Sequence, residues 1–388
     1  MNASPIRAQS AEFDAGIQRQ FIEGMNNYAA HNYIGAEAIF RAILDRNPRL
    51  LRVRLELART LFMEKRDEQA DYHFRLAAGE QPSAAVLRNI TRFREAIRAR
   101  RAWRLNFDIG FAPDSNINSA TDKESVDVYG LPFQLDPSAH ARSGTGVFVG
   151  GDASVRLNRF GKVPIYLGAY GRWTRYQDHR FDDAYVGAEA GPEFKLAGGR
   201  LRTTGTALMR WYGTRPLVSS LGGHFDYEKL VGDKWTLGGS LLVRRNDYDR
   251  RRDVDGWDAE IRALANRPLG PTTLGFLYVS VERNWANDRG QAFWRESLGV
   301  GALKEIGWGL RPQISVDLAR QTGDGPLAPF GERRRDWLLQ GRFSIYKRDW
   351  NIGGFAPSLS VTVTRNFSTV TLYDEKRLRG EVRLTRAF

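Results

Sequence analysis

The sequence predicts a chain of two parts, a short helical repeat domain followed by a 14-stranded antiparallel transmembrane β-barrel. Three observations predict this fold. Small, aromatic and proline residues recur at a 34-residue spacing within the first hundred positions. From Trp103 onward, apolar residues occupy every second position, which is the period of a strand. The connections between these segments alternate between short and long, as in bacterial outer-membrane barrels.

Composition narrows the class of protein. The 388 residues suffice for two domains, and no window approaches 18 consecutive apolar residues, which excludes a transmembrane helix. The chain has no cysteine, so disulfides and thiolate-ligated metals are excluded. Its net charge of +13 is spread along the whole chain and suits a polar barrel lumen, so we expect no nucleic-acid partner. The first residues lack the apolar segment of an export signal; we expect that a native signal was removed and that Met1 was added.

The helical part, expected over residues 1–102, resembles tetratricopeptide repeats. Small residues let the paired helices approach, an aromatic side chain fills the space against the next repeat, and a proline ends the second helix. An unrelated pair of antiparallel helical hairpins is the alternative. Helices are expected near 11–30, 33–46, 50–63, 67–78 and 83–101. The matched packing positions are Gly24 and Ala58, Ala36 and Ala70, Phe40 and Phe74, and Pro48 and Pro82.

The fifth helix is strongly basic. Seven arginines lie between Arg88 and Arg104, against the single acid Glu95. The helix either caps the two repeats or lets them pack on the barrel, because two repeats are fewer than usually form a stable stack. Its charge indicates an anionic partner or lipid phosphates, or else simply a solvated linker helix.

Residues 103–388 are expected to form the barrel. The segment from Leu105 to Phe111 shows the alternation clearly, with apolar residues on one face and polar residues or glycine on the other. An even strand number, 14, agrees with bacterial single-chain barrels. Strands are expected near 104–112, 145–157, 163–176, 184–195, 200–212, 221–231, 234–246, 256–267, 271–285, 292–304, 307–320, 335–347, 355–366 and 376–388.

The lengths of the connections predict how the barrel is oriented in the membrane. Short turns should face the periplasm together with the helical domain and the chain end, and longer charged loops such as 113–144 should lie outside. The segment 348–354 breaks this alternation. Nine of the ten tryptophans lie beyond residue 103, which indicates an interfacial girdle rather than the core of a soluble β-sandwich. The terminal Phe388 is expected to be read by the barrel assembly machinery.

Residues suited to catalysis or metal binding are sparse. The five histidines show no metal-ligand spacing, and the acidic loop around His179 is expected to be solvated. Ser219 and Ser220 precede His224, but nothing pairs a serine with a base. We therefore expect no enzyme, no cofactor and no metal.

One segment, FDIGFAPDSNIN at 107–118, concentrates polar side chains around Pro113, where the first strand should break. Such residues satisfy backbone groups in turns, so an elaborate turn is one interpretation. The other is a gate or seam element that folds toward the lumen. The gate and partner candidates are Asp108, Asp114, Asn116 and Asn118.

This segment, placed after a short repeat domain in a chain ending at Phe388, resembles the family of surface lipoprotein assembly modulators. The resemblance covers essentially the whole chain and is most specific at residues 104–118. It implies an outer-membrane translocon for a surface lipoprotein or a secreted haem- or iron-acquisition protein. The partners implied or expected are that client, periplasmic chaperones, the barrel assembly machinery and outer-membrane lipids.

Three functions are therefore compared. In a translocon, the repeats would hold the client or its chaperones under the barrel, and the lumen or an opening between the first and last strands would pass it. A diffusion pore or polysaccharide exporter is the second, and the arginines predicted in the barrel would make such a pore favour anions. An outer-membrane enzyme is the third.

Overall fold

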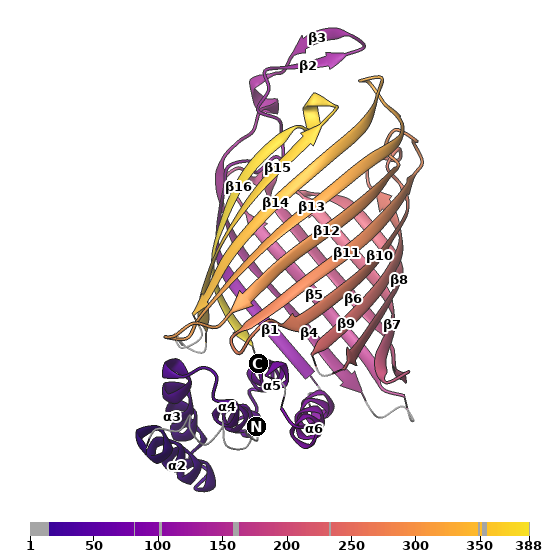
Figure 1. Ribbon diagram of the computed structural model, residues 1–388. Helices are drawn as coiled ribbons and strands as arrows, with labels where there is room; N and C mark the ends of the chain where they lie inside the picture. Colours follow the sequence, from indigo (N-terminus) through magenta and orange to yellow (C-terminus); the bar gives the residue numbers. More distant parts are fainter. Residues whose placement is uncertain are drawn as a thin grey trace, which may run out of the picture.

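The computed structural model describes residues 15–387 except 81, 101–102, 158–162, 233, 348–349 and 351–354. Within them, helices gather at one end of a closed barrel (Figure 1). None of the described helices is long and apolar enough to cross a membrane. We call the end of the barrel that faces the helices the helical rim and the opposite end the far rim.

The helices follow the predicted order and form two antiparallel hairpins with a fifth helix beside them. The first begins at Ala15, where the described residues begin. The bounds are α2 Ala15–Ala29, α3 Tyr33–Arg46, α4 Leu51–Met63, α5 Asp67–Gly79 and α6 Ala84–Arg100.

The matched small and aromatic residues line the core between these helices. A Cβ atom at Gly24 would lie only 2.6 Å from the Phe40 ring, so a larger residue there would separate α2 from α3. Ala36, Ala58 and Ala70 are fully buried, and Pro48 and Pro82 follow the ends of α3 and α5.

The fifth helix completes this core. Phe93 stacks on Phe74 with ring centroids 5.2 Å apart, while Ile90 and Ile97 are buried. Arg94 is also buried and binds Asp71 of α5 at 2.6 Å. Part of the positive charge on α6 therefore holds the helices together, whereas Arg88 and Arg92 remain exposed.

Each of the fourteen segments predicted from the alternation is a barrel strand, and the first strand closes on the last. Neighbours are antiparallel throughout. The bounds are β1 Trp103–Asp114, β4 Gly144–Leu157, β5 Ile165–Arg175, β6 Asp183–Leu196, β7 Gly199–Tyr212, β8 Arg215–Val231, β9 Trp235–Tyr248, β10 Gly256–Pro268, β11 Thr273–Ala286, β12 Phe293–Lys304, β13 Leu310–Leu327, β14 Glu332–Lys347, β15 Ala356–Ser368 and β16 Glu375–Ala387.

Two strands extend six or more residues beyond their predicted bounds. β8 begins at Arg215 rather than 221, which leaves a two-residue turn where a long loop was expected. Pro216 pairs with Trp211 of β7 beside a register shift, and the register with β9 starts only at Val218, so no ladder with β9 is interrupted there. β13 likewise continues to Leu327 past a register shift after Thr322. The irregular segment 348–354 lies largely outside the described residues.

The barrel exterior is apolar. Exposed aliphatic and aromatic side chains alternate with inward polar ones along every long strand, as a lipid-facing belt requires. Tryptophans lie near both rims, and Trp257 of β10 directly faces Trp285 of β11. Those toward the far rim are Trp173, Trp211, Trp257, Trp285, Trp294 and Trp337, and those toward the helical rim are Trp103, Trp235, Trp308 and Trp350.

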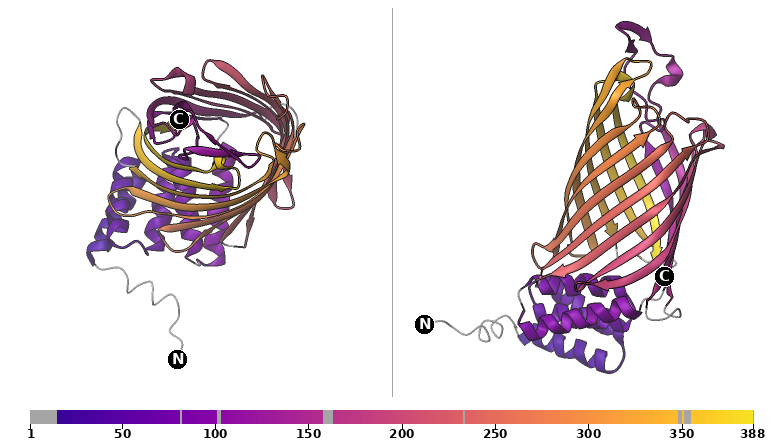
Figure 2. Two further views of the ribbon diagram at one scale, coloured as in Figure 1. Left: turned by 90° about the horizontal axis from the view of Figure 1, so that it is seen from above. Right: turned by 90° about the vertical axis from the view of Figure 1, so that its right-hand side faces the viewer.

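The long connection between β1 and β4 contains a hairpin that the sequence did not predict. Its strands are β2 Ser125–Val128 and β3 Leu131–Gln134. The hairpin stands beyond the far rim rather than inside the lumen (Figures 1 and 2). Tyr129 at its tip approaches Gly331 in the β13–β14 turn, so the hairpin leans across the last strands of the barrel.

The helices dock on one side of the helical rim. Tyr72 and Leu76 of α5 are buried against Leu274 of β11 and Leu303 of β12. The Tyr72 hydroxyl donates to the Thr272 carbonyl oxygen at 3.4 Å, and a Cβ at Gly79 would meet Pro268 at 2.4 Å. The contact is thus a small apolar core that fixes α5 under β10–β12.

Candidate functional site

The seam between β1 and β16 is the place where the two ends of the barrel sheet meet. Residues 106–111 pair with 382–387, and Asp114 pairs with Arg379, but the pairing is interrupted between them. Pro113 lies in this gap, where it offers no N–H to the ladder. The ring of Pro113 comes within 3.1 Å of the Cβ position of Gly380. The seam therefore combines two paired stretches with a local break near the far rim.

Glycine permits the close approach of the seam strands. A Cβ at Gly110 would lie 2.1 Å from the Val382 carbonyl oxygen and 2.8 Å from the Phe148 ring. No side chain fits there without displacing backbone. The glycine of the FDIGFAPDSNIN segment is thus required by the closure of the barrel.

Beyond the break, the chain after β1 is tied to β16 by hydrogen bonds. The Ser115 N–H donates to the Leu378 carbonyl oxygen at 3.0 Å, and the Leu378 N–H donates to the Ser115 hydroxyl at 2.8 Å. The Asn116 side-chain amide donates to the carbonyl oxygens of Lys376 and Ala120. We call residues 114–119 the clasp, because they join the first strand to the last where the regular ladder stops.

A buried ion pair anchors the clasp. The Asp114 side chain is fully buried and accepts hydrogen bonds from Arg377, the shortest at 2.6 Å. The Asn116 N–H also donates to this carboxylate at 3.0 Å. One carboxylate therefore links the end of β1, the clasp backbone and β16.

The four gate candidates predicted from the sequence do not form a single cluster. Asp114 and Asn116 lie in the clasp. Asn118 closes the base of the long loop by donating to the His140 carbonyl oxygen and accepting from the Arg142 N–H. Asp108 faces Arg383 at 3.9 Å within the barrel. Phe388 lies outside the described residues.

Sequence reasoning did not find Arg377, which is the clasp's principal partner. It stands 263 residues from Asp114, and only the closure of the barrel brings the two together. An indication did exist in the last strand, where Arg377, Arg379 and Arg383 fall on one face at strand period.

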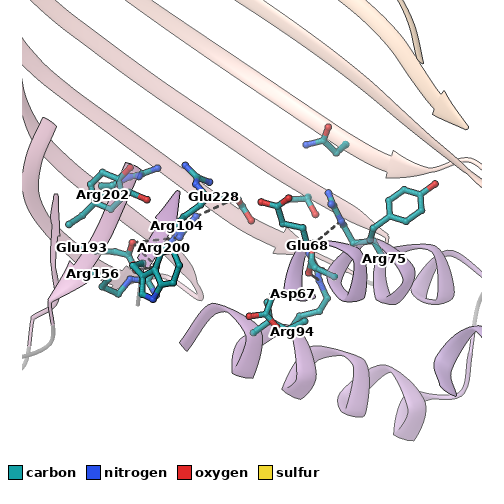
Figure 3. A pocket seen from close by; sticks show the side chains of 18 of the residues that line it. Asp67, Glu68, Arg75, Arg94, Arg104, Arg156, Glu193, Arg200, Arg202 and Glu228 are labelled. Atoms are coloured by element: carbon teal, nitrogen blue, oxygen red, sulfur yellow. Dashed lines mark hydrogen bonds and ion pairs between the residues drawn. The ribbon is translucent and has the colours of Figure 1, made fainter. Parts of the chain in front are cut away.

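At the helical rim, a cavity of about 580 Å³ opens between the helices and the barrel wall (Figure 3). We call it the vestibule. One side carries charged residues of α5 and α6, among them Asp67 and Arg94, and the other carries residues of β1, β4–β10 and β13. The wall residues form a network in which Glu193 binds Arg156 at 3.1 Å and Arg200 at 3.5 Å. The docked helices therefore leave a space with a polar lining at the helical rim, and the start of β1 borders it.

The carboxylates of the acidic loop around His179 accept hydrogen bonds from neighbouring residues of the same segment. The hydrogen bonds from Arg180 hold the pKa of Asp178 at about 2, and Asp182 accepts from the Tyr176 N–H. Among the described residues, no cluster of three acidic or histidine side chains is placed to hold a metal ion.

The candidate serine–histidine pair does not come together either. The Ser220 hydroxyl donates to the Asn246 side-chain oxygen at 2.6 Å. His224 lies 3.8 Å from Glu189 instead. Within the described part of the chain, this serine therefore binds an amide and not a base.

Known proteins similar to this chain were found by sequence and by structure. A protein 24% identical over 99% of this chain and 78% of its own length is surface lipoprotein assembly modifier 1 of Neisseria meningitidis. Hemophilin secretion modulator of Acinetobacter baumannii is 20% identical over 86% of this chain and 71% of its own length. The outer-membrane channel DcaP of Acinetobacter baumannii is a loose structural neighbour, with a TM-score of 0.42 and 9% identity over 73% of this chain and 96% of its own. The model of the surface lipoprotein assembly modifier family matches residues 103–388, so the chain belongs to this family.

Proposed function

We propose that this protein is an outer-membrane translocon that delivers a surface lipoprotein or a secreted haem-acquisition protein across the outer membrane. Membership in the family supports this function, and one relative is named for modulating the secretion of hemophilin. Deletion of the gene should leave the client inside the cell envelope. Surface exposure of the client at the normal level in the deletion strain would exclude the proposal.

The helical part, residues 1–102, is proposed to lie in the periplasm as a short tetratricopeptide domain. Support comes from its hairpin packing and its position at the rim where the chain also ends (Figure 1). There it would receive the client or its chaperones beside the vestibule, next to the start of β1. The barrel assembly machinery is proposed to read the terminal Phe388, and outer-membrane lipids to surround the apolar belt.

The seam is proposed as the place where the client leaves the barrel. The observation that carries this step is the interrupted pairing of β1 with β16, held by the clasp. A ladder with a break opens at a lower cost than a continuous one, because fewer backbone hydrogen bonds must be broken. Since the periplasm lacks ATP, folding of the client outside would make its passage one-way.

A disulfide across the seam tests this step. Ile109 of β1 and Leu384 of β16 are direct partners on the lipid-facing side. Directly opposite residues of antiparallel strands lie within the reach of a disulfide, and the chain has no other cysteine to interfere. Ile109→Cys with Leu384→Cys should stop client delivery when oxidised and restore it when reduced.

The matched control lies in a continuous part of the sheet. Val279 of β11 and Leu298 of β12 are also direct partners with exposed side chains. The pair Val279→Cys and Leu298→Cys should cross-link without affecting delivery. Normal delivery through the oxidised seam variant would exclude lateral exit, and equal loss in both variants would point to passage through a lumen that must widen everywhere.

A pore for small solutes is the second candidate, because the lumen is polar and contains a cavity of about 560 Å³. Such a pore would carry steady ionic current in planar bilayers without any client. The translocon predicts little current while the helices stay docked.

A further inference from the structure

A group of arginines lines one wall of the barrel lumen. The cavity of about 560 Å³ lies between β13–β16 and β5–β6. Five arginines border it, against only two acidic residues. They are Arg172, Arg342, Arg377, Arg379 and Arg383, and the acids are Asp183 and Glu381.

Both acids are already occupied. Glu381 accepts from Arg172 at 2.9 Å, from Arg379 at 2.9 Å and from Arg383 at 2.5 Å, so one carboxylate faces three guanidinium groups. Asp183 is bound by Arg210 through two hydrogen bonds of 2.9 Å. The wall therefore carries an excess of positive charge that its own carboxylates do not neutralise.

Two of the arginines keep donors unused. Arg342 is exposed to the lumen and has no hydrogen bond or ion pair among the described residues. The Nε atom of Arg379 is buried without a hydrogen-bond partner. A buried guanidinium donor without an acceptor is costly, so a movement of the Arg379 side chain, which is 31% exposed, that brought this donor to an anion would be favoured.

The strand register places these two arginines in one row. Arg342 of β14 is the direct partner of Thr362 on β15, and Thr362 is the direct partner of Arg379 on β16. The Cα atoms of Arg342 and Arg379 are thus two strand spacings apart, about 10 Å. Inside a closed barrel, long side chains from such positions converge toward the axis. The Thr362 hydroxyl lies between them as a further donor.

We propose that Arg342, Thr362 and Arg379 form a binding site for an oxyanion, either a carboxylate or a phosphate. Guanidinium groups bind both through paired hydrogen bonds. The site does not depend on the proposed function, because it concerns the charge of the lumen wall and needs no client.

The test measures binding of two probes, citrate and pyrophosphate, to the purified full-length chain in a neutral detergent at low salt. Isothermal titration calorimetry should show binding of at least one of them. Loss of one charge-assisted contact in Arg342→Gln should weaken binding about tenfold or more. Heat-modifiable migration on gels confirms that the variant barrel is folded.

The matched control is Arg262→Gln on β10. Arg262 is an exposed barrel arginine that is paired with Glu260 at 2.7 Å and lies outside this cavity. Binding in this variant should equal that of the unmodified chain. Binding of citrate alone or pyrophosphate alone identifies the chemistry of the anion. The proposal is overturned when neither probe binds at millimolar concentration, or when Arg342→Gln and Arg262→Gln behave alike.

Discussion

Substitution of Asp114 by asparagine should loosen the seam. The change removes the carboxylate charge and turns an amide NH₂ group toward the guanidinium of Arg377, which loses the carboxylate that it binds. Breaking a buried ion pair from one side costs about 3–5 kcal/mol. The Arg377 side chain is 24% exposed, so water in the lumen can solvate part of its charge, and we expect the lower end, about 3 kcal/mol.

The assay is urea unfolding in lipid vesicles, followed by tryptophan fluorescence, with hydrogen exchange measured on peptides from β16 and β11. The free energy of unfolding should fall, and exchange should rise in β16 but not in β11 on another part of the wall. Arg377→Gln should have a similar effect, and the double variant should cost less than the sum of the two single ones.

The matched control is Asp178→Asn, whose partner Arg180 is 72% exposed. This pair lies in a loop, where water solvates both charges, so unfolding should not change measurably. An unfolding curve of Asp114→Asn that coincides with that of the unmodified chain would contradict the role assigned to the clasp. Equal exchange increases in β16 and β11 would show that the pair supports the barrel in general rather than the seam.

Three further perturbations address the closure and the docking. Gly110→Ala should sharply lower the yield of heat-modifiable barrel, because its Cβ would meet the Val382 carbonyl, whereas Gly205→Ala, with its nearest neighbour 4.0 Å away, should fold normally. Leu76→Ala should weaken the docking of α5 by about 2–5 kcal/mol and expose the helices to protease, while Ile34→Ala at a 79% exposed position should not. Burial, with Glu305 nearby, raises the pKa of Tyr72 to about 12, so its contribution to docking should be complete below pH 10 and should weaken as the pH rises from 10 to 12. Tyr72→Phe should remove this pH dependence, measured by the protease sensitivity of the helices.

The sequence predicted the barrel well because its information is local. Alternation of polar and apolar residues sets the strands, and turn residues set most of their ends. It misplaced the start of β8, where Pro216 and the following serines have the composition of a loop. In the structure this stretch projects beyond the neighbouring strand β9, so a proline there breaks no ladder on that side.

The candidate site was only half predictable. The unusual density of polar residues around Pro113 indicated a special segment, and Asp114 and Asn116 do lie at the seam. Their partners on β16 could not be named, because pairing between the first and last strands depends on the tilt and stagger of the whole barrel. The row of Arg342, Thr362 and Arg379 depends on the same register across three strands.

The short path from α6 to β1 has a mechanical consequence. α6 ends at Arg100 and β1 starts at Trp103, so three Cα-to-Cα steps, at most about 11 Å, join the helices to the barrel. A pull on the helices would be transmitted through the chain to β1, the strand that closes the cylinder, and through side-chain contacts to β10–β12. In the proposed function, force on a client held by the helices acts on β1 at the seam, while the contact at Leu76 holds α5 against β11 and β12.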